Sequence, residues 1–200
     1  AIIRTWSDTN PGEMYYYDRN KGNIAFIAKS RPWINKDEMS PMLPISFKAR
    51  DGLEINGYLT IPKNSNGKNL PLIINPHGGP ASRDIWTYNP EHQFFASRGY
   101  AVLSMNFRGS LGYGRNHVKM ANGQWGRKMQ DDVTDSVKWA VEQGYADPDN
   151  VCIYGASYGG YAVMAGITKT PELYKCAVNY VGVTDMGLLF SKMPKVWEIW

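Results

Sequence analysis

The stretch of sequence that decides the fold is residues 151–168, VCIYGASYGGYAVMAGIT. It opens with an apolar run, residues 151–154, that is typical of a strand buried on both faces. From Tyr158 onward the pattern is typical of a helix, so Ser157 falls on the turn between the two. A serine on a sharp strand-to-helix turn, in the pattern G-x-S-x-G, forms a nucleophile elbow. We therefore predict that Ser157 is a nucleophile.

The neighbours of Ser157 have a physical reason to be glycine. Gly155 and Gly159 lack a Cβ atom, which lets other chain segments approach a strained turn closely. The helix that follows would point its free N–H groups at the serine and favour a developing negative charge. The alternative is that Ser157 only caps this helix. The strand–helix context of the motif favours the catalytic interpretation.

Strands and helices alternate on both sides of this stretch. Apolar runs typical of buried strands occur at 70–75, 101–105, 151–154 and 176–181, and helical patterns at 90–98, 129–141 and 158–168. This alternation predicts a parallel sheet with helices on both faces. Asp51-Gly52 separates two alternating runs and predicts an antiparallel hairpin at the edge of that sheet. We expect an α/β-hydrolase fold over residues 45–200.

The first part of the chain follows another pattern. Two β-prone runs, 13–18 and 23–28, flank a turn that contains Gly22, and they predict a β-hairpin. A hairpin alone is only marginally stable in water, so we expect residues 1–30 to end a larger β domain. Residues 31–44 are polar and contain prolines, which is typical of a linker.

A glycine-rich turn at 75–80, NPHGGP, follows another buried strand. Acyl transfer needs two N–H donors aimed at the oxyanion. We expect the N–H groups of Tyr158 and Gly79 to be this pair, since one follows the nucleophile and the other lies on a turn after an earlier strand. An ordinary tight turn is the alternative at Gly79. The elbow two strands later favours the oxyanion interpretation.

The histidines do not supply a base for the serine. In α/β-hydrolases the order along the chain is serine, acid, histidine, whereas all three histidines here precede Ser157. We predict that His77 is structural and hydrogen-bonds the oxyanion turn, and that His92 and His117 are surface or packing residues. Asp185 comes after the last predicted strand, but we do not expect it to be the triad acid. The acidic residues at the start of the helix over 129–141 are explained by the helix dipole; they are Asp131, Asp132 and Asp135.

Composition and charge exclude several other classes of protein. The formal net charge of +4 is spread along 200 residues, and no apolar stretch approaches the length of a membrane span. We therefore expect neither a nucleic-acid nor a membrane partner. Residues 109–114 match no nucleotide-binding loop and the histidines show no metal-ligand spacing, so no cofactor and no metal is expected. Cys152 and Cys176 are predicted to be buried free thiols.

Three motifs in this order resemble the catalytic domain of the prolyl oligopeptidase family of serine peptidases. They are HGGP at 77–80, NFRGSLGYG at 106–114 and GASYGGY at 155–161. The resemblance is strongest to the acylaminoacyl-peptidase and dipeptidyl-peptidase-like branch, and it covers residues 44–185. The sequence departs from the pattern at Asn106, where relatives often have Asp.

This resemblance implies cleavage of short peptides through an acyl-enzyme on Ser157. Members of the family carry a β-propeller before the catalytic domain, so residues 1–30 would be its last strands. The family's triad Asp and His lie well beyond the serine, and we therefore expect this chain to be an inactive fragment of a longer enzyme. Oligopeptides are the expected substrate. The sequence leaves open whether the protein forms a homo-oligomer and in which cellular compartment it acts.

Two alternatives to a peptidase also stay open. An elbow and an oxyanion hole serve any acyl transfer, so a carboxylesterase on the same fold is the first. The propeller-like start of the chain favours the peptidase. A non-catalytic binding module on a hydrolase fold is the second, and the intact elbow at Ser157 argues against it.

Overall fold

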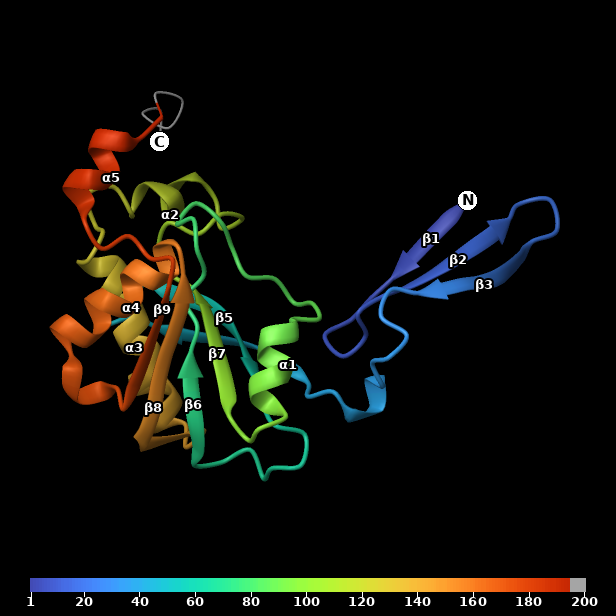
Figure 1. Ribbon diagram of the computed structural model, residues 1–200, viewed down its shortest axis with the longest axis horizontal. Coiled ribbons are helices and arrows are strands. Elements are labelled where there is room, and N and C mark those ends of the chain that lie inside the picture. Colours follow the sequence, from blue (N-terminus) through green and yellow to red (C-terminus); the bar gives the residue numbers. More distant parts are fainter. Residues whose placement is uncertain (195–200) are drawn as a thin grey trace.

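The computed structural model describes residues 1–194 and contains two β-sheets (Figure 1). The first is an antiparallel sheet with the order β1-β2-β3, formed by β1 (Ile2–Thr5), β2 (Glu13–Asp18) and β3 (Asn23–Lys29). The predicted hairpin is present as β2 and β3, while β1 was not predicted. This sheet stands apart from the rest of the protein and exposes large apolar side chains such as Ile24 and Phe26.

Specific contacts join the first sheet to the rest. Gln93, which is buried, accepts a hydrogen bond from Ser40 N at 2.8 Å, and its amide donates to the carbonyls of Ser40 at 2.8 Å and Asp8 at 3.3 Å. The carboxylate of Asp8 accepts from Met42 N at 2.8 Å. A short 3-10 helix, η1 (Lys36–Glu38), lies in the connection. Strand β4 begins at Met42, within the last residues of the predicted linker.

The second sheet has six strands in the order β4-β5-β7-β6-β8-β9. Their bounds are β4 (Met42–Lys48), β5 (Glu54–Thr60), β6 (Leu70–Ile74), β7 (Ala101–Asn106), β8 (Ala146–Ala156) and β9 (Cys176–Tyr180). Strands β4, β5 and β7 pair antiparallel, whereas β7, β6, β8 and β9 pair parallel. The predicted parallel sheet with an antiparallel edge is thus confirmed. Because β6 lies beside β8, the turns that follow these two strands meet at one edge.

Helices cover both faces of this sheet (Figure 1). The helices of the described residues are α1 (Pro90–Ala96), α2 (Arg115–Lys119), α3 (Lys128–Glu142), α4 (Tyr158–Lys169), α5 (Met186–Lys192) and the 3-10 turn η2 (Pro171–Leu173). Helix α1 packs on β5 and β7, while α3 and α4 pack on the other side, toward β8. Within residues 1–194, no helix is both long enough and apolar enough to cross a bilayer.

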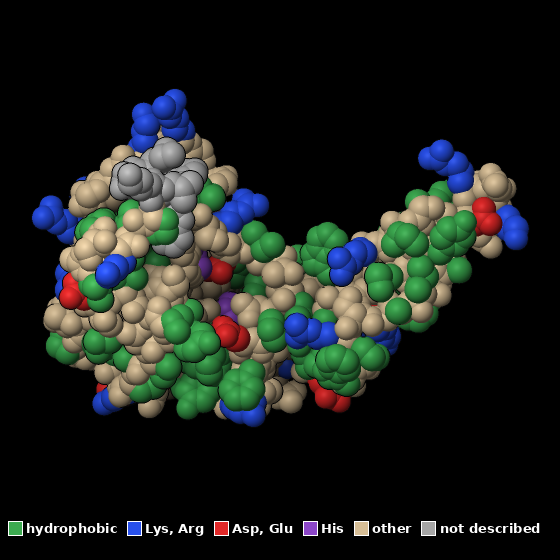
Figure 2. Space-filling model, turned by 45° about the horizontal axis from the view of Figure 1, so that its top comes forward, with side chains coloured by type: hydrophobic (Ala, Val, Ile, Leu, Met, Phe, Trp, Pro, Cys, Tyr) green, Lys and Arg blue, Asp and Glu red, His purple; other side chains and the backbone are tan. Residues whose placement is uncertain are grey.

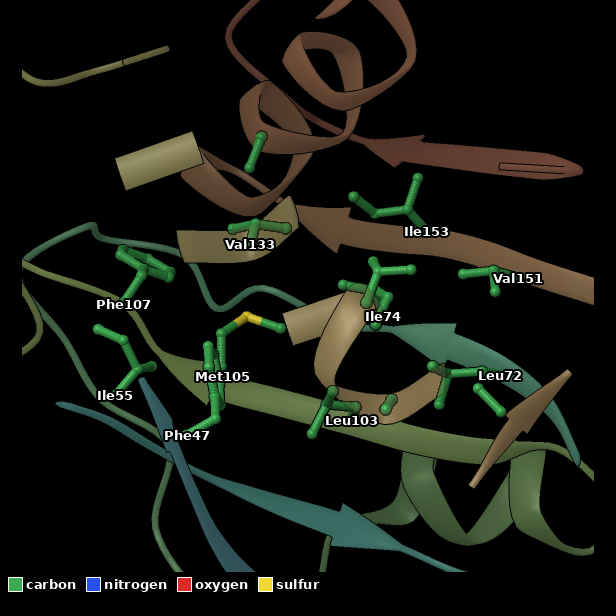
Figure 3. Packing of buried hydrophobic residues seen from close by; sticks show 14 of the residues in the cluster. Phe47, Ile55, Leu72, Ile74, Leu103, Met105, Phe107, Val133, Val151 and Ile153 are labelled. Carbon is green, nitrogen blue, oxygen red and sulfur yellow. The ribbon is translucent and has the colours of Figure 1, made fainter. Parts of the chain in front are cut away.

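The core lies between the sheet and the helices α3 and α4. Figure 3 shows side chains of β6, β7 and β8, among them Ile74, Met105 and Ile153, gathered with Val133 of α3. Ile74, Met105 and Ile153 have no exposed surface. Burying an aliphatic side chain of this size contributes roughly 1.5–3 kcal/mol. This layer fixes the strands whose ends carry the candidate site.

The acidic residues of α3 have partners that the sequence did not indicate. The guanidinium of Arg108, just after β7, binds Asp132 at 2.7 and 2.8 Å and Asp51 at 2.8 and 2.9 Å. Arg50 binds Asp135 at 2.7 Å. The explanation by the helix dipole alone was therefore wrong, since a buried carboxylate such as Asp132 requires a bound cation. Arg108 also holds the pKa of Asp51 well below its usual range.

The two cysteines form a disulfide and are not the buried free thiols that we predicted. Cys152 and Cys176 are direct partners in the parallel pair β8–β9, with Cα atoms 4.7 Å apart. Cys176 is exposed on β9, which is the edge strand of the sheet within residues 1–194. The pairing depends on the register of two strands, which neither apolar run specifies by itself.

Reduction of this disulfide should lower the free energy of unfolding by about 2–4 kcal/mol, because the cross-link restricts the unfolded chain. Urea denaturation with and without dithiothreitol measures the change. The double variant Cys152→Ser, Cys176→Ser is the control, and its midpoint should not respond to the reductant. Two titratable thiols in the unreduced, denatured protein would contradict the assignment.

Candidate active site

Ser157 occupies the turn between the end of β8 and the start of α4. Its backbone has φ 57° and ψ −120°, a left-handed conformation that is strained for a residue with a side chain. Its N–H donates to the carbonyl of Tyr180 in β9 at 3.1 Å, which holds the turn from the neighbouring strand. The side chain is exposed, and in the described residues its hydroxyl makes no capping hydrogen bond to the helix. The hydroxyl is therefore available to react.

Glycines let three backbone segments converge beneath the serine. A Cβ atom on Gly159 would collide with the carbonyl oxygen of Pro76, and one on Gly155 would lie 2.6 Å from the carbonyl carbon of Gly159. A Cβ atom on Gly160 would lie 2.6 Å from the Cα of Gly182, beyond β9. The close approach predicted for Gly155 and Gly159 is confirmed, and Gly160 adds a third contact. The elbow thus packs on the segments that follow both β6 and β9.

The glycine-rich turn after β6 lies directly against the serine. A Cβ atom on Gly78 would be 3.4 Å from the Cβ of Ser157 and 4.0 Å from its Oγ. The next residue, Gly79, is exposed and has φ 124°, which favours glycine. Within residues 1–194, neither Gly79 N–H nor Tyr158 N–H donates a hydrogen bond. The two predicted oxyanion donors are therefore free to bind a ligand oxygen.

His77 braces the glycine-rich turn, as predicted. Its Nδ1 lies 2.7 Å from the carbonyl oxygen of Gly78, which can only accept, so Nδ1 carries the proton. Its Nε2 must then accept from the hydroxyl of Ser110, at 2.8 Å. The ring also stacks on Phe107, with centroids 4.3 Å apart, and burial lowers the pKa of His77. Both nitrogens are engaged, so this imidazole is not a free base for Ser157.

The other two histidines are packing residues and do not lie on the surface. His92 is buried; its Nε2 lies 3.1 Å from Asn75 Oδ1, its Nδ1 lies 3.3 Å from the Thr60 hydroxyl, and burial lowers its pKa to about 4. The amide of Asn75 donates to the carbonyl of Tyr154 in β8 at 2.9 Å. His117 is also buried and donates to the carbonyl of Phe107 at 3.2 Å. All three histidines of the sequence are thus engaged away from Ser157.

Tyr158 contributes to the core through its side chain. The ring is 2% exposed, its hydroxyl contacts the sulfur of Met129 at 3.7 Å, and burial raises the pKa of Tyr158. Trp125 and Tyr161 pack against it, with centroids 4.7 and 5.6 Å away. Only the backbone N–H of Tyr158 can therefore face a substrate.

Asp185 caps α5 by accepting from Leu188 N at 2.9 Å, and this accounts for its position after β9.

The strand ends carry two asparagines, of which Asn106 is buried, that the sequence analysis did not identify as site residues. Asn75 follows β6 and Asn106 ends β7, and both hold neighbouring segments with side-chain hydrogen bonds. The available signal was a polar residue directly after an apolar strand. Figure 2 shows a hollow on the face toward this edge, with histidine and acidic side chains on its wall.

An elbow serine, a glycine-rich turn against it and this strand order define an α/β-hydrolase site. The family model "Prolyl oligopeptidase family" matches residues 86–200, so the chain belongs to the prolyl oligopeptidase family, whose members are serine-type hydrolases. Dipeptidyl aminopeptidase BIII of Pseudoxanthomonas mexicana is 40% identical over 190 residues, and dipeptidyl peptidase family member 6 of Caenorhabditis elegans is 32% identical over 221 residues.

Solved structures agree with this assignment. A puromycin-hydrolyzing peptidase of Mycobacterium tuberculosis matches 95% of the chain with a TM-score of 0.84 and 26% identity. An acylaminoacyl peptidase in complex with Z-Gly-Gly-Phe-chloromethyl ketone matches 96% of the chain with a TM-score of 0.78 and 27% identity. The chain spans about 30% of each of these structures. The sequence matches cover 92% and 98% of the chain but only 28% and 30% of the two relatives.

Substitution of Gly159 by alanine should lower the free energy of unfolding by about 1–3 kcal/mol, because the new methyl group meets the Pro76 carbonyl. Glycine-to-alanine changes inside helices ordinarily raise the free energy of unfolding by up to about 1 kcal/mol, whereas we predict that this one lowers it. Chemical denaturation of both proteins gives the difference.

Gly187→Ala in α5 is the matched control. The atom nearest to its new Cβ is a side-chain oxygen of Asp185, at 3.3 Å, so little or no loss is expected. A Gly159→Ala protein that is as stable as the wild type would show that the backbone is not packed as closely as described.

Proposed function

We propose that the whole protein containing this chain is a serine peptidase that hydrolyses short peptides through an acyl-enzyme on Ser157. The observation that carries the proposal is an exposed hydroxyl on a strained turn, together with two N–H groups, those of Tyr158 and Gly79, that donate no hydrogen bond within residues 1–194. The peptidase names of the similar proteins support peptides as substrates.

The chemistry follows from this arrangement. Ser157 Oγ attacks the scissile carbonyl and forms a bond to its carbon, while its proton passes to a base. The carbonyl oxygen becomes an oxyanion between the N–H groups of Tyr158 and Gly79, where each donor contributes about 10²–10³-fold to the rate. The amine leaves with a proton, and water then hydrolyses the ester. The N-terminus of α4 adds its dipole to the stabilisation of negative charge.

The base for Ser157 is proposed to come from outside residues 1–200. Since His77, His92 and His117 are all engaged elsewhere, the 200-residue chain by itself is expected to be inactive. A serine without a base is a weak nucleophile at neutral pH. The exposed apolar side chains along edge strand β9, Val178 and Tyr180, are suited to further packing by the whole protein.

The domain assignment is also a proposal. Residues 1–30 would be the end of a β-propeller, residues 31–44 its connection, and residues 45–200 part of the hydrolase domain, of which 195–200 lie outside the described residues. The exposure of Ile2 (63%), Ile24 (62%) and Phe26 (56%) supports this, because a three-stranded sheet with such faces needs neighbours.

Turnover by the whole protein tests the proposal. We expect hydrolysis of aminoacyl- or dipeptidyl-p-nitroanilides, and Ser157→Ala should lower kcat by at least about 10⁴-fold. Ser97→Ala, at another exposed serine, is the matched control and should retain full activity. Turnover of p-nitrophenyl esters alone would favour a carboxylesterase, and turnover of neither substrate would favour a non-catalytic module.

A further inference from the structure

The turn that carries Gly79 is held at its far end by a side chain from β7. Asn106 is the last residue of that strand and has no exposed surface. Its Oδ1 accepts from Asp84 N at 2.8 Å, and its Nδ2 donates to the carbonyl of Asp84 at 3.1 Å. The side-chain amide thus pairs with the Asp84 backbone as a neighbouring strand would. Asp84 lies five residues after Gly79.

Two more hydrogen bonds join the same two segments. Leu111 N donates to the carbonyl of Ser82 at 2.8 Å, and the hydroxyl of Ser110 bonds His77 at 2.8 Å. Residues 77–84 are therefore fastened to residues 106–113 at both ends and in the middle. Gly79 lies between these fixed points, so the direction of its N–H depends on them.

The hydrogen-bond partners of position 106 in this chain match an amide. Asn106 accepts one hydrogen bond and donates two, the second to the hydroxyl of Tyr113 at 2.9 Å. A carboxylate has the same shape but only accepts, so it would leave the Asp84 carbonyl facing a negative charge. Asp84 is itself a largely buried acid: its Oδ2 has no partner in the described residues, and burial raises its pKa to about 7. A second buried carboxylate here would be unfavourable.

We propose that Asn106 is a positioning residue that sets the orientation of the Gly79 N–H through the backbone of Asp84. The proposal rests on the proposed function, in which that N–H binds the oxyanion. The contact between N–H and oxyanion is strongest in the transition state, so misplacing it lowers kcat and leaves KM nearly unchanged.

Asn106→Asp in the whole protein tests this, with Asn64→Asp as the matched control on an exposed loop. The Asn106 variant should lose about 10- to 100-fold in kcat with KM within about threefold of the wild type, while the control stays unchanged. The ratio of variant to wild-type kcat should rise as the pH falls, because a protonated carboxyl regains one donor. The proposal would be overturned if Asn106→Asp had the same kcat as the wild type, or if its kcat fell without recovering at low pH.

Hydrogen exchange separates this proposal from the proposed function. The amides of Ser82 and Asp84, which donate hydrogen bonds in the wild type, should exchange faster in Asn106→Asp than in the wild type and in Asn64→Asp, whatever the activity. If the wild type shows no turnover, the proposed function fails, and hydrogen exchange alone tests whether Asn106 positions the turn. Exchange rates that are unchanged in Asn106→Asp would overturn the positioning role of Asn106. Should Asn106→Asp not fold, Tyr113→Phe removes one partner of the amide and should lower kcat by a few-fold at constant KM, and an unchanged kcat counts against the proposal.

Discussion

The close packing of backbone on backbone beneath Ser157 is the constraint on which the rest of the site depends. The carbonyl of Pro76 occupies the space where a side chain of Gly159 would be. The backbone of Gly182, after β9, likewise occupies the space where a side chain of Gly160 would be. These contacts bring the ends of β6, β8 and β9 together and hold Ser157 in a left-handed conformation. The serine on this turn is exposed.

Around this centre, polar side chains at the strand ends fix the loops. Asn75 ties the end of β6 to β8, and His77 ties the glycine-rich turn to the segment after β7. Arg108 adds a buried ion pair that fastens the same segment to α3 and to the β4–β5 turn. Rigid elements thus hold each group that would contact a substrate, as a preorganised oxyanion site requires.

The sequence alone was sufficient to predict those features that depend on residues close together in the chain. The apolar runs of β6, β7 and β8 and the helical pattern of α4 depend on local periodicity, and the elbow glycines adjoin the serine they serve. The Cys152–Cys176 disulfide, the Arg108–Asp132 pair and the Asn106–Asp84 pairing join residues far apart in the chain. Their partners are set by strand register and order, which no local pattern specifies. Strand β1 was missed because its four residues are too short to show an alternation.

Labelling of the whole protein by a fluorophosphonate tests most directly that Ser157 is the activated nucleophile. The reagent phosphonylates a serine only where a base and an oxyanion site act on its hydroxyl, so the site of reaction identifies the catalytic residue. Peptide mapping by mass spectrometry should place the adduct on Ser157, and prior denaturation should abolish it. An unlabelled protein, or an adduct on a different serine, would contradict the account.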